Sequence, residues 1–184
     1  MTGYPGENLA ADPPFQPLSL LEDKSGVLRG AYGCFPSGVV AVSALIGGKP
    51  VCMIASSFVA VSIEPALVAF CVQWTSQTWA ALKDVPRLGI SVLGEGHDGN
   101  VRRLASRAED KFDQLGLSVS AEDAVFIDGA TAWLDCRIHS VVPAGDHGIV
   151  LLEIEALTTR QLAEPLVFHG GQFRALQQRP KSGG

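Results

Sequence analysis

Along most of the chain, apolar residues either alternate with polar ones or gather in short runs, and few stretches have a helical period. The clearest alternation is in Ala130 to Val142. One face there carries Ala132, Leu134, Cys136 and Ile138, and the other carries Trp133, Asp135, Arg137 and His139. This period of two predicts a strand with one wet face.

Turn residues separate this segment from other expected strands. Val39 to Ile46 and a strand beginning at Val51 flank Gly47 to Pro50, which predicts a β-hairpin. Ile149 to Leu157 alternates again, with its glutamates on the wet face. Further strands are expected at 58–63, 66–72 (after a turn at Glu64-Pro65), 88–93, 124–127, and 166–168 paired with 172–174.

Helical patterns are few and short. Ser25 to Phe35 is expected to be a helix capped by Ser25, ending before Pro36. Shorter helices are expected at Trp79 to Leu82 and at Asn100 to Ala108, with a loop at Gly94 to Gly99. The predicted fold class is therefore mainly β, a β-barrel with a few short helices, because consecutive hairpins that close leave no unpaired edges.

Length and composition fit one domain, which we place at 25–176, between a flexible arm at 1–24 and a flexible tail at 177–184. Of the 184 residues, 47% are hydrophobic and 18% charged, with a net charge of −5. This charge argues against a nucleic-acid partner, and no apolar run is long enough for a membrane helix. No secretory signal pattern is visible, so we expect a cytoplasmic protein whose four cysteines are buried thiols.

The stretch Pro50 to Thr78 carries the most suggestive chemistry. Ser56-Ser57 interrupts an apolar run, and Thr75 to Thr78 precedes a helical pattern. A β-bulge and a helix N-cap would explain these residues without any ligand. Alternatively, backbone amides, small hydroxyls and a helix N-terminus along one groove would suit a flat cofactor with a phosphate tail.

Other motifs are weaker. Gly94 to Gly99 spells GxGxxG, with Asp113 near the offset of a ribose-binding acid, but no alternation of parallel strands and helices surrounds it. A glycine-rich turn is the favoured interpretation. The four histidines fit no metal-binding spacing, no catalytic triad is visible, and His147 after Gly145-Asp146 is the most suggestive of them.

Seven motifs occur in the order seen in the flavin-reductase-like family, and from about Leu28 to Leu176 the chain resembles that family. They are FPSGVVAVSA (35–44), VCMIASSFVAVSIEPALVAFCV (51–72), TSQTW (75–79), LGISVL (88–93), DKF (110–112), GDH (145–147) and PLVFHGGQF (165–173). The resemblance implies an FMN-binding split barrel. It also implies hydride transfer from NADH or NADPH to FMN or FAD, a homodimer, and a partner flavin-dependent monooxygenase.

The resemblance also implies roles for individual residues. His147 would lie at the nicotinamide as the catalytic-site residue, with no metal involved. The implied cofactor-binding residues are the wall Pro50, Val51, Cys52, Met53, Ile54, Ser56 and Ser57, the ribityl and phosphate contacts Val72, Gln73, Ser76, Gln77, Thr78, Lys111 and Phe112, and the nicotinamide-side pair Phe168 and His169. The alternatives are a flavin carrier or store on the same barrel, a dehydrogenase using Gly94 to Gly99, and a barrel without cofactor.

Overall fold

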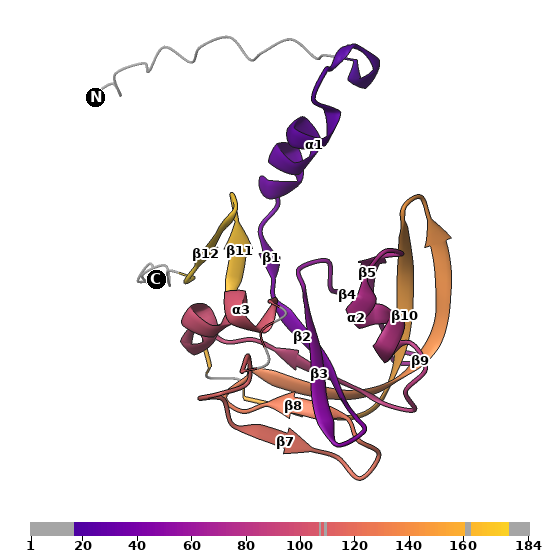
Figure 1. The fold of residues 1–184 in the computed structure, drawn as a ribbon, viewed down its shortest axis with the longest axis vertical. Helices are drawn as coiled ribbons and strands as arrows, with labels where there is room; N and C mark the ends of the chain where they lie inside the picture. Colours follow the sequence, from indigo (N-terminus) through magenta and orange to yellow (C-terminus); the bar gives the residue numbers. More distant parts are fainter. Residues whose placement is uncertain (1–16, 107, 109, 161–162, 177–184) are drawn as a thin grey trace, which may run out of the picture.

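The computed structural model describes residues 17–106, 108, 110–160 and 163–176, and it is dominated by strands (Figure 1). The strands are β1 (Ser37–Gly38), β2 (Val40–Ile46), β3 (Lys49–Ala55), β4 (Val59–Ser62), β5 (Leu67–Gln73), β6 (Leu88–Val92), β7 (Leu117–Val119), β8 (Val125–Ile127), β9 (Ala132–Ala144), β10 (His147–Thr159), β11 (Val167–His169) and β12 (Gln172–Arg174). The helices are α1 (Lys24–Gly33), α2 (Gln77–Leu82) and α3 (Asp98–Leu104), with 3₁₀ turns η1 (Leu18–Leu20) and η2 (Glu95–His97).

The main sheet has seven strands in the order β3-β2-β6-β9-β10-β5-β4, and each neighbouring pair is antiparallel. A second sheet, β1-β11-β12, stands beside it, and β7 pairs with β8 below (Figure 1). The prediction of a mainly β barrel with a few short helices is confirmed. The barrel is not closed by hydrogen bonds all round, because pairing in the main sheet ends at β3 on one side and at β4 on the other.

Strand β2 is buried on both faces, which explains its uninterrupted apolar sequence. Val40 and Val42 pack into a core cluster with Phe70, whereas Ala41 packs into a second cluster with Leu104. The first cluster fills the concave side of the main sheet together with Trp79 and Leu82 of α2, among others. Two cores on opposite faces hold β2 rigidly, and β2 in turn carries β3, which leads into the candidate site.

Most expected elements are present, but their boundaries shift. Helix α1 begins at Lys24 and is capped by Asp23, whose carboxylate accepts from the Gly26 amide at 2.8 Å, so the expected Ser25 cap is wrong. The expected loop at Gly94 to Gly99 contains η2 and the start of α3. The strands β9 and β10 are longer than expected, because the turn between them needs only Gly145-Asp146.

Two short strands were missed. Ser37–Gly38 forms β1 through pairing with β11, and Leu117–Val119 forms β7 through pairing with β8. Neither has a pattern of its own, since each is defined only by a partner distant in sequence. The predicted arm and tail, 1–24 and 177–184, fall largely on residues 1–16 and 177–184, which lie outside the described residues.

Candidate functional site

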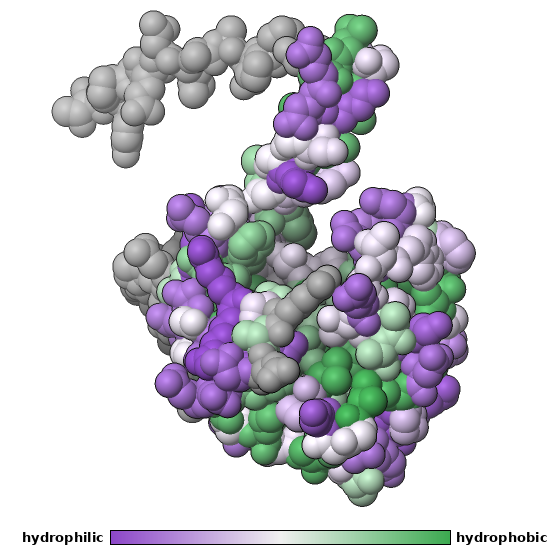
Figure 2. All heavy atoms as spheres, viewed as in Figure 1, coloured by the Kyte–Doolittle hydropathy of each residue, from purple (hydrophilic) through white to green (hydrophobic). Residues whose placement is uncertain are grey.

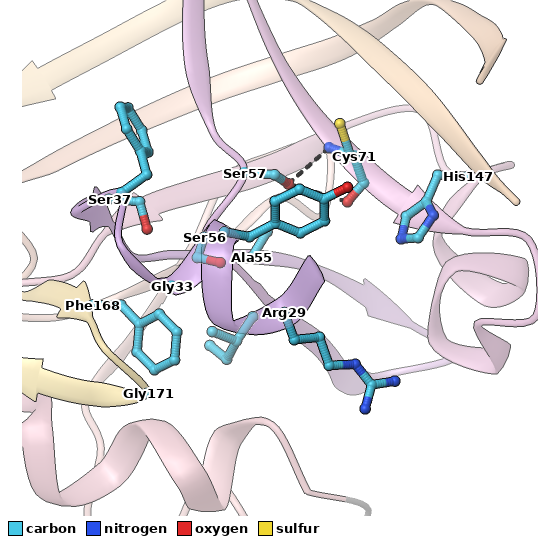
Figure 3. A pocket seen from close by; sticks show the side chains of 13 residues that line it. Arg29, Gly33, Ser37, Ala55, Ser56, Ser57, Cys71, His147, Phe168 and Gly171 are labelled. Carbon is cyan, nitrogen blue, oxygen red and sulfur yellow. Dashed lines mark hydrogen bonds between the residues drawn. The ribbon is translucent and has the colours of Figure 1, made fainter. Parts of the chain in front are cut away.

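A cavity of about 680 Å³ opens between α1, the end of β3, β5, β10 and the β11–β12 hairpin. Its volume lies within the range of small-molecule and cofactor pockets. Figure 3 shows its labelled residues converging from segments far apart in the sequence. The cavity is lined by Arg29, Tyr32, Gly33, Phe35, Ser37, Ile54, Ala55, Ser56, Ser57, Cys71, His147, Phe168 and Gly171.

The segment after β3 presents polar groups to this cavity. Ser57 Oγ accepts from the Cys71 amide at 2.9 Å and donates to the Cys71 carbonyl at 3.2 Å, so this hydroxyl clamps the segment onto β5 (Figure 3). The amide N–H groups of Ser56 and Ser57 donate to no described residue, and neither does the Ser56 hydroxyl. These groups are therefore available to bind the polar edge of a ligand.

His147 lies across the cavity from Phe168 (Figure 3) and begins β10. Its Nδ1 is 2.7 Å from Asp146 Oδ1. A carboxylate can only accept, so Nδ1 donates to Asp146, and Nε2 has no partner among the described residues. The bond also lowers the pKa of Asp146, chiefly through hydrogen bonding and then through charge interaction with His147.

The opposite wall is aromatic. Phe168 on β11 packs at a tilt against Phe173 on β12, with ring centroids 5.4 Å apart. Pairing of Ser37 with Phe168 joins this hairpin to β1, and the Gly170 amide donates to the Gly33 carbonyl at 2.8 Å. The hairpin therefore connects the end of α1 to the apolar side of the cavity.

Helix α1 contributes Arg29, Tyr32 and Gly33 to the lining, which the sequence interpretation missed. The helix stands clear of the body and buries none of its residues (Figure 2). The available signal was the spacing i, i+3, i+4, which places these residues on one helical face. The sequence interpretation also missed five further lining residues, although Cys71 lies beside the predicted Val72 and Gly171 lies two residues after the predicted His169. These five are Phe35, Ser37, Ala55, Cys71 and Gly171.

The structure brings five of the predicted site residues together in the cavity lining, namely Ile54, Ser56, Ser57, Phe168 and His147. The other twelve lie outside it. Cys52 and Val72 have buried side chains that belong to the two core clusters. The remaining ten are Pro50, Val51, Met53, Gln73, Ser76, Gln77, Thr78, Lys111, Phe112 and His169.

Two of these outlying residues have clear local partners. Ser76 caps α2, because its Oγ accepts from the Trp79 amide at 3.2 Å, as the N-cap interpretation expects. Lys111 Nζ donates to the Cys52 carbonyl at 3.0 Å and lies 5.5 Å from the centroid of the Phe112 ring. Both side chains have structural roles here, and their contact with a cofactor stays a prediction.

The GxGxxG segment serves the fold through His97. This buried imidazole accepts from the Gly94 amide through Nδ1 at 3.1 Å, and its Nε2 lies 3.0 Å from the Asp128 carbonyl. The glycine-rich stretch is thereby tied to the turn after β8, which favours the structural interpretation of this motif. Within the described ranges, no cluster of His, Cys, Asp and Glu side chains is placed to hold a metal ion.

The expectation of four buried thiols is only half correct. Cys52 and Cys136 are buried, whereas Cys34 and Cys71 are exposed. Burial raises the pKa of Cys52 to about 11 and that of Cys136 to about 12. Cys71 differs because alternate residues of β5 face opposite sides, and its side faces the cavity rather than the core.

Comparison with known proteins gives concordant matches. The family model described as flavin reductase like domain matches residues 32–177. A flavin reductase of Pseudomonas putida is 36% identical over 146 residues, which cover 79% of this chain and 86% of that protein. The reductase subunit of a Rhodococcus jostii flavin-dependent monooxygenase is 32% identical over 81% of this chain and 76% of its own length.

A solved structure of a Streptomyces globisporus NADH:FAD oxidoreductase, in complex with NAD and FAD fragments, has the same fold. Its TM-score is 0.79 at 35% identity, and the match covers 89% of this chain and 99% of the other. None of the helices in the described part of this chain has the length and apolar character needed to cross a membrane.

Proposed function

Because this chain belongs to the flavin-reductase-like family, we propose that it catalyses hydride transfer from NADH or NADPH to FMN or FAD in the cavity beside α1. The observation that carries this assignment is the set of unpartnered donors at Ser56 and Ser57, facing an aromatic wall at Phe168. A ring system with a polar edge and apolar faces needs both kinds of surface.

The residues present fit a flavin. Ser56 and Ser57 line the cavity, and the bonds between Ser57 and Cys71 use the Ser57 hydroxyl and leave both serine amides without a partner among the described residues. Ile54 and Phe168 supply apolar contact for the faces of a ring. A bound flavin supplies the chemistry, because its ring accepts the hydride that the nicotinamide gives up.

The chain itself binds, orients and stabilises. The fixed amide donors after β3 would stabilise negative charge that develops on a bound ring, at no reorganisation cost. His147, held by Asp146, would present Nε2 toward the nicotinamide side of the cavity. No strong acid and base pair is needed, since a hydride moves between two cofactors rather than a proton to a side chain.

We further propose that the chain forms a homodimer and supplies reduced flavin to a partner monooxygenase. The named function of the Rhodococcus jostii relative supports such a partner. Apolar side chains left exposed along β4, at Val59 and Val61, and beyond it at Ile63, offer a surface for a second copy. Four free cysteines fit the reducing cytoplasm that we infer as its location.

The decisive experiment is steady-state kinetics that crosses NADH and NADPH with riboflavin, FMN and FAD, followed by the absorbance of the reduced nicotinamide. We expect flavin-dependent oxidation with at least one pair. Ordered kinetics would indicate a diffusing flavin substrate, and ping-pong kinetics a bound group. Flavin binding without nicotinamide oxidation would contradict the proposal and favour a flavin carrier or store.

A further inference from the structure

The wall that α1 contributes to the cavity carries a cation that has no partner among the described residues. We propose that Arg29 recognises the phosphate or diphosphate group of a nucleotide bound in this cavity, an inference that rests on the proposed function. Arg29 on α1 would then bind the charged tail of a ligand, and the segment after β3 would bind its ring.

The charges of the lining single out Arg29. Of the thirteen lining residues, Arg29 alone has a permanent charge, and none is an aspartate or glutamate. The chain as a whole carries a net charge of −5, so a carboxylate-free wall with one guanidinium stands apart from the average surface. Such a wall attracts an anion without a competing acid inside the cavity.

Arg29 has no competing partner in the described residues, where it makes no hydrogen bond or ion pair. Three other arginines are paired with carboxylates. Arg103 lies 2.6 Å from Asp110, Arg87 lies 3.7 Å from Glu155, and Arg137 pairs with both Glu153 and Glu155. The Arg29 guanidinium therefore keeps its five donors for a ligand, and its planar fork matches two oxygens of a phosphate.

Tertiary contacts at the end of α1 hold Arg29 at the cavity. The Gly33 carbonyl, one turn after Arg29, accepts from the Gly170 amide at 2.8 Å, which anchors the end of α1 to the β11–β12 turn. Tyr32 and Gly33 from the same helical turn also line the cavity. In Figure 3 the Arg29 side chain leaves α1 on the side away from Phe168, and its guanidinium lies below His147 in this view.

The phosphate could belong to the flavin or to the nicotinamide dinucleotide, and one set of variants distinguishes the two. Arg29→Ala removes the guanidinium, and Lys24→Ala on the same helix, outside the cavity, is the control with the same change in charge. Riboflavin, FMN and FAD are titrated into each protein by flavin fluorescence. NADH is then varied at saturating flavin, and both series are repeated at raised salt.

If the flavin phosphate is recognised, Arg29→Ala should weaken FMN and FAD binding about tenfold and leave riboflavin within about twofold. If the dinucleotide phosphate is recognised, all flavin affinities should stay unchanged while the KM for NADH rises about tenfold at nearly constant kcat. In either case the wild-type affinity should fall with salt more steeply than that of Arg29→Ala. Arg29→Lys should recover part of the loss, because it restores the charge but not the fork.

Equal effects of Arg29→Ala on riboflavin and FMN with an unchanged KM for NADH would overturn the assignment, as would equal losses in Lys24→Ala. Circular dichroism and the Tm of each variant check folding, and Arg29→Gln provides a second test if the alanine variant is unstable. The flavin titrations need no turnover. Failure of the Arg29 inference is therefore separate from failure of the wild type to oxidise NADH.

Discussion

Cys71 shows how a single residue reports on the site. It is exposed in the cavity wall, whereas Cys34 is exposed at the end of α1, outside the lining. Both thiols should react with a disulfide reagent in the folded protein at about pH 8, because both are exposed to it. Cys52 and Cys136 should react only after unfolding, since burial raises their pKa values to about 11 and about 12.

A bound flavin should protect one of the two exposed thiols. We expect saturating FMN or FAD to slow modification of Cys71 at least about tenfold, because a ligand in the cavity excludes the reagent. The rate at Cys34 should stay within about twofold and serves as the internal control. The variants Cys71→Ser and Cys34→Ser assign each rate, and equal protection of both thiols would contradict the placement of the site.

Asp135 and Asp146 are expected to affect stability with opposite dependence on pH. Burial raises the pKa of Asp135, partly countered by Arg87, while the hydrogen bond from His147 lowers that of Asp146. A raised pKa means that stability falls as pH rises above about 4 through the folded-state value. A lowered pKa means that stability is lost as pH falls below about 4.

The corresponding asparagine variants test these signs. Relative to the wild type, Asp135→Asn should gain unfolding free energy as the pH rises from about 4 to about 7. Asp146→Asn should lose unfolding free energy relative to the wild type as the pH rises from about 2 to about 4. The measurement is denaturant unfolding of all three proteins across this range. Parallel pH profiles for the two variants would show that the environments of the carboxylates are wrongly described.

At the scale of elements, the contact between β6 and β8 depends on one glycine. A methyl group on Gly89 would overlap the carbonyl of Val125, and backbone atoms cannot yield as a flexible side chain can. We expect Gly89→Ala to lower the unfolding free energy by about 1–3 kcal/mol. A change below about 0.5 kcal/mol would show that the two strands separate easily.

Gly96 provides the matched control in the glycine-rich turn. Nothing lies within 4 Å of a methyl group at Gly96, so Gly96→Ala should change stability by less than about 0.5 kcal/mol. The same variant should leave cofactor binding unchanged, because His97 gives this turn a structural role. Loss of nicotinamide binding in Gly96→Ala or Gly96→Val would instead favour the dehydrogenase alternative.

At the scale of the whole molecule, the exposed apolar residues beside β4 are the basis for expecting a homodimer. Ile63 is 92% exposed beside the edge strand β4, an arrangement that natural proteins usually cover. We expect sedimentation equilibrium to give twice the chain mass of 19.4 kDa. Ile63→Lys should weaken the dimer at least about tenfold, since a buried ammonium without a partner opposes association.

Leu157→Lys is the control. Leu157 is also exposed, but it lies in the second half of β10, where it pairs with Leu134 of β9 and not with β5. This variant should leave the mass unchanged. A monomeric wild type would contradict the homodimer proposal while leaving the reductase proposal to the kinetic test. A dimer insensitive to Ile63→Lys would place the interface on another surface.

Local patterns in the sequence were enough to predict the strands that have a face of their own. The two-residue period of β9 and β10, the continuous apolar run of β2 and the glycine turns each arise from neighbours in the chain. The same reasoning located Ser56, Ser57 and, with the family resemblance, His147. Boundaries moved by a few residues because strand ends depend on where a partner strand stops.

Only the tertiary structure decided which of these residues share a cavity. Arg29, Cys71 and Phe168 are separated by long stretches of sequence. Arg29 and Phe168 line one cavity because β1 pairs with β11 and α1 is anchored at Gly170, and Cys71 joins them through its hydrogen bonds with Ser57. Likewise, burial turned Cys52 and Val72 into core residues although they lie in the most suggestive segment. Sequence determines the period of each segment, whereas long-range pairing determines which side chains face the same space, and no local pattern contains that information.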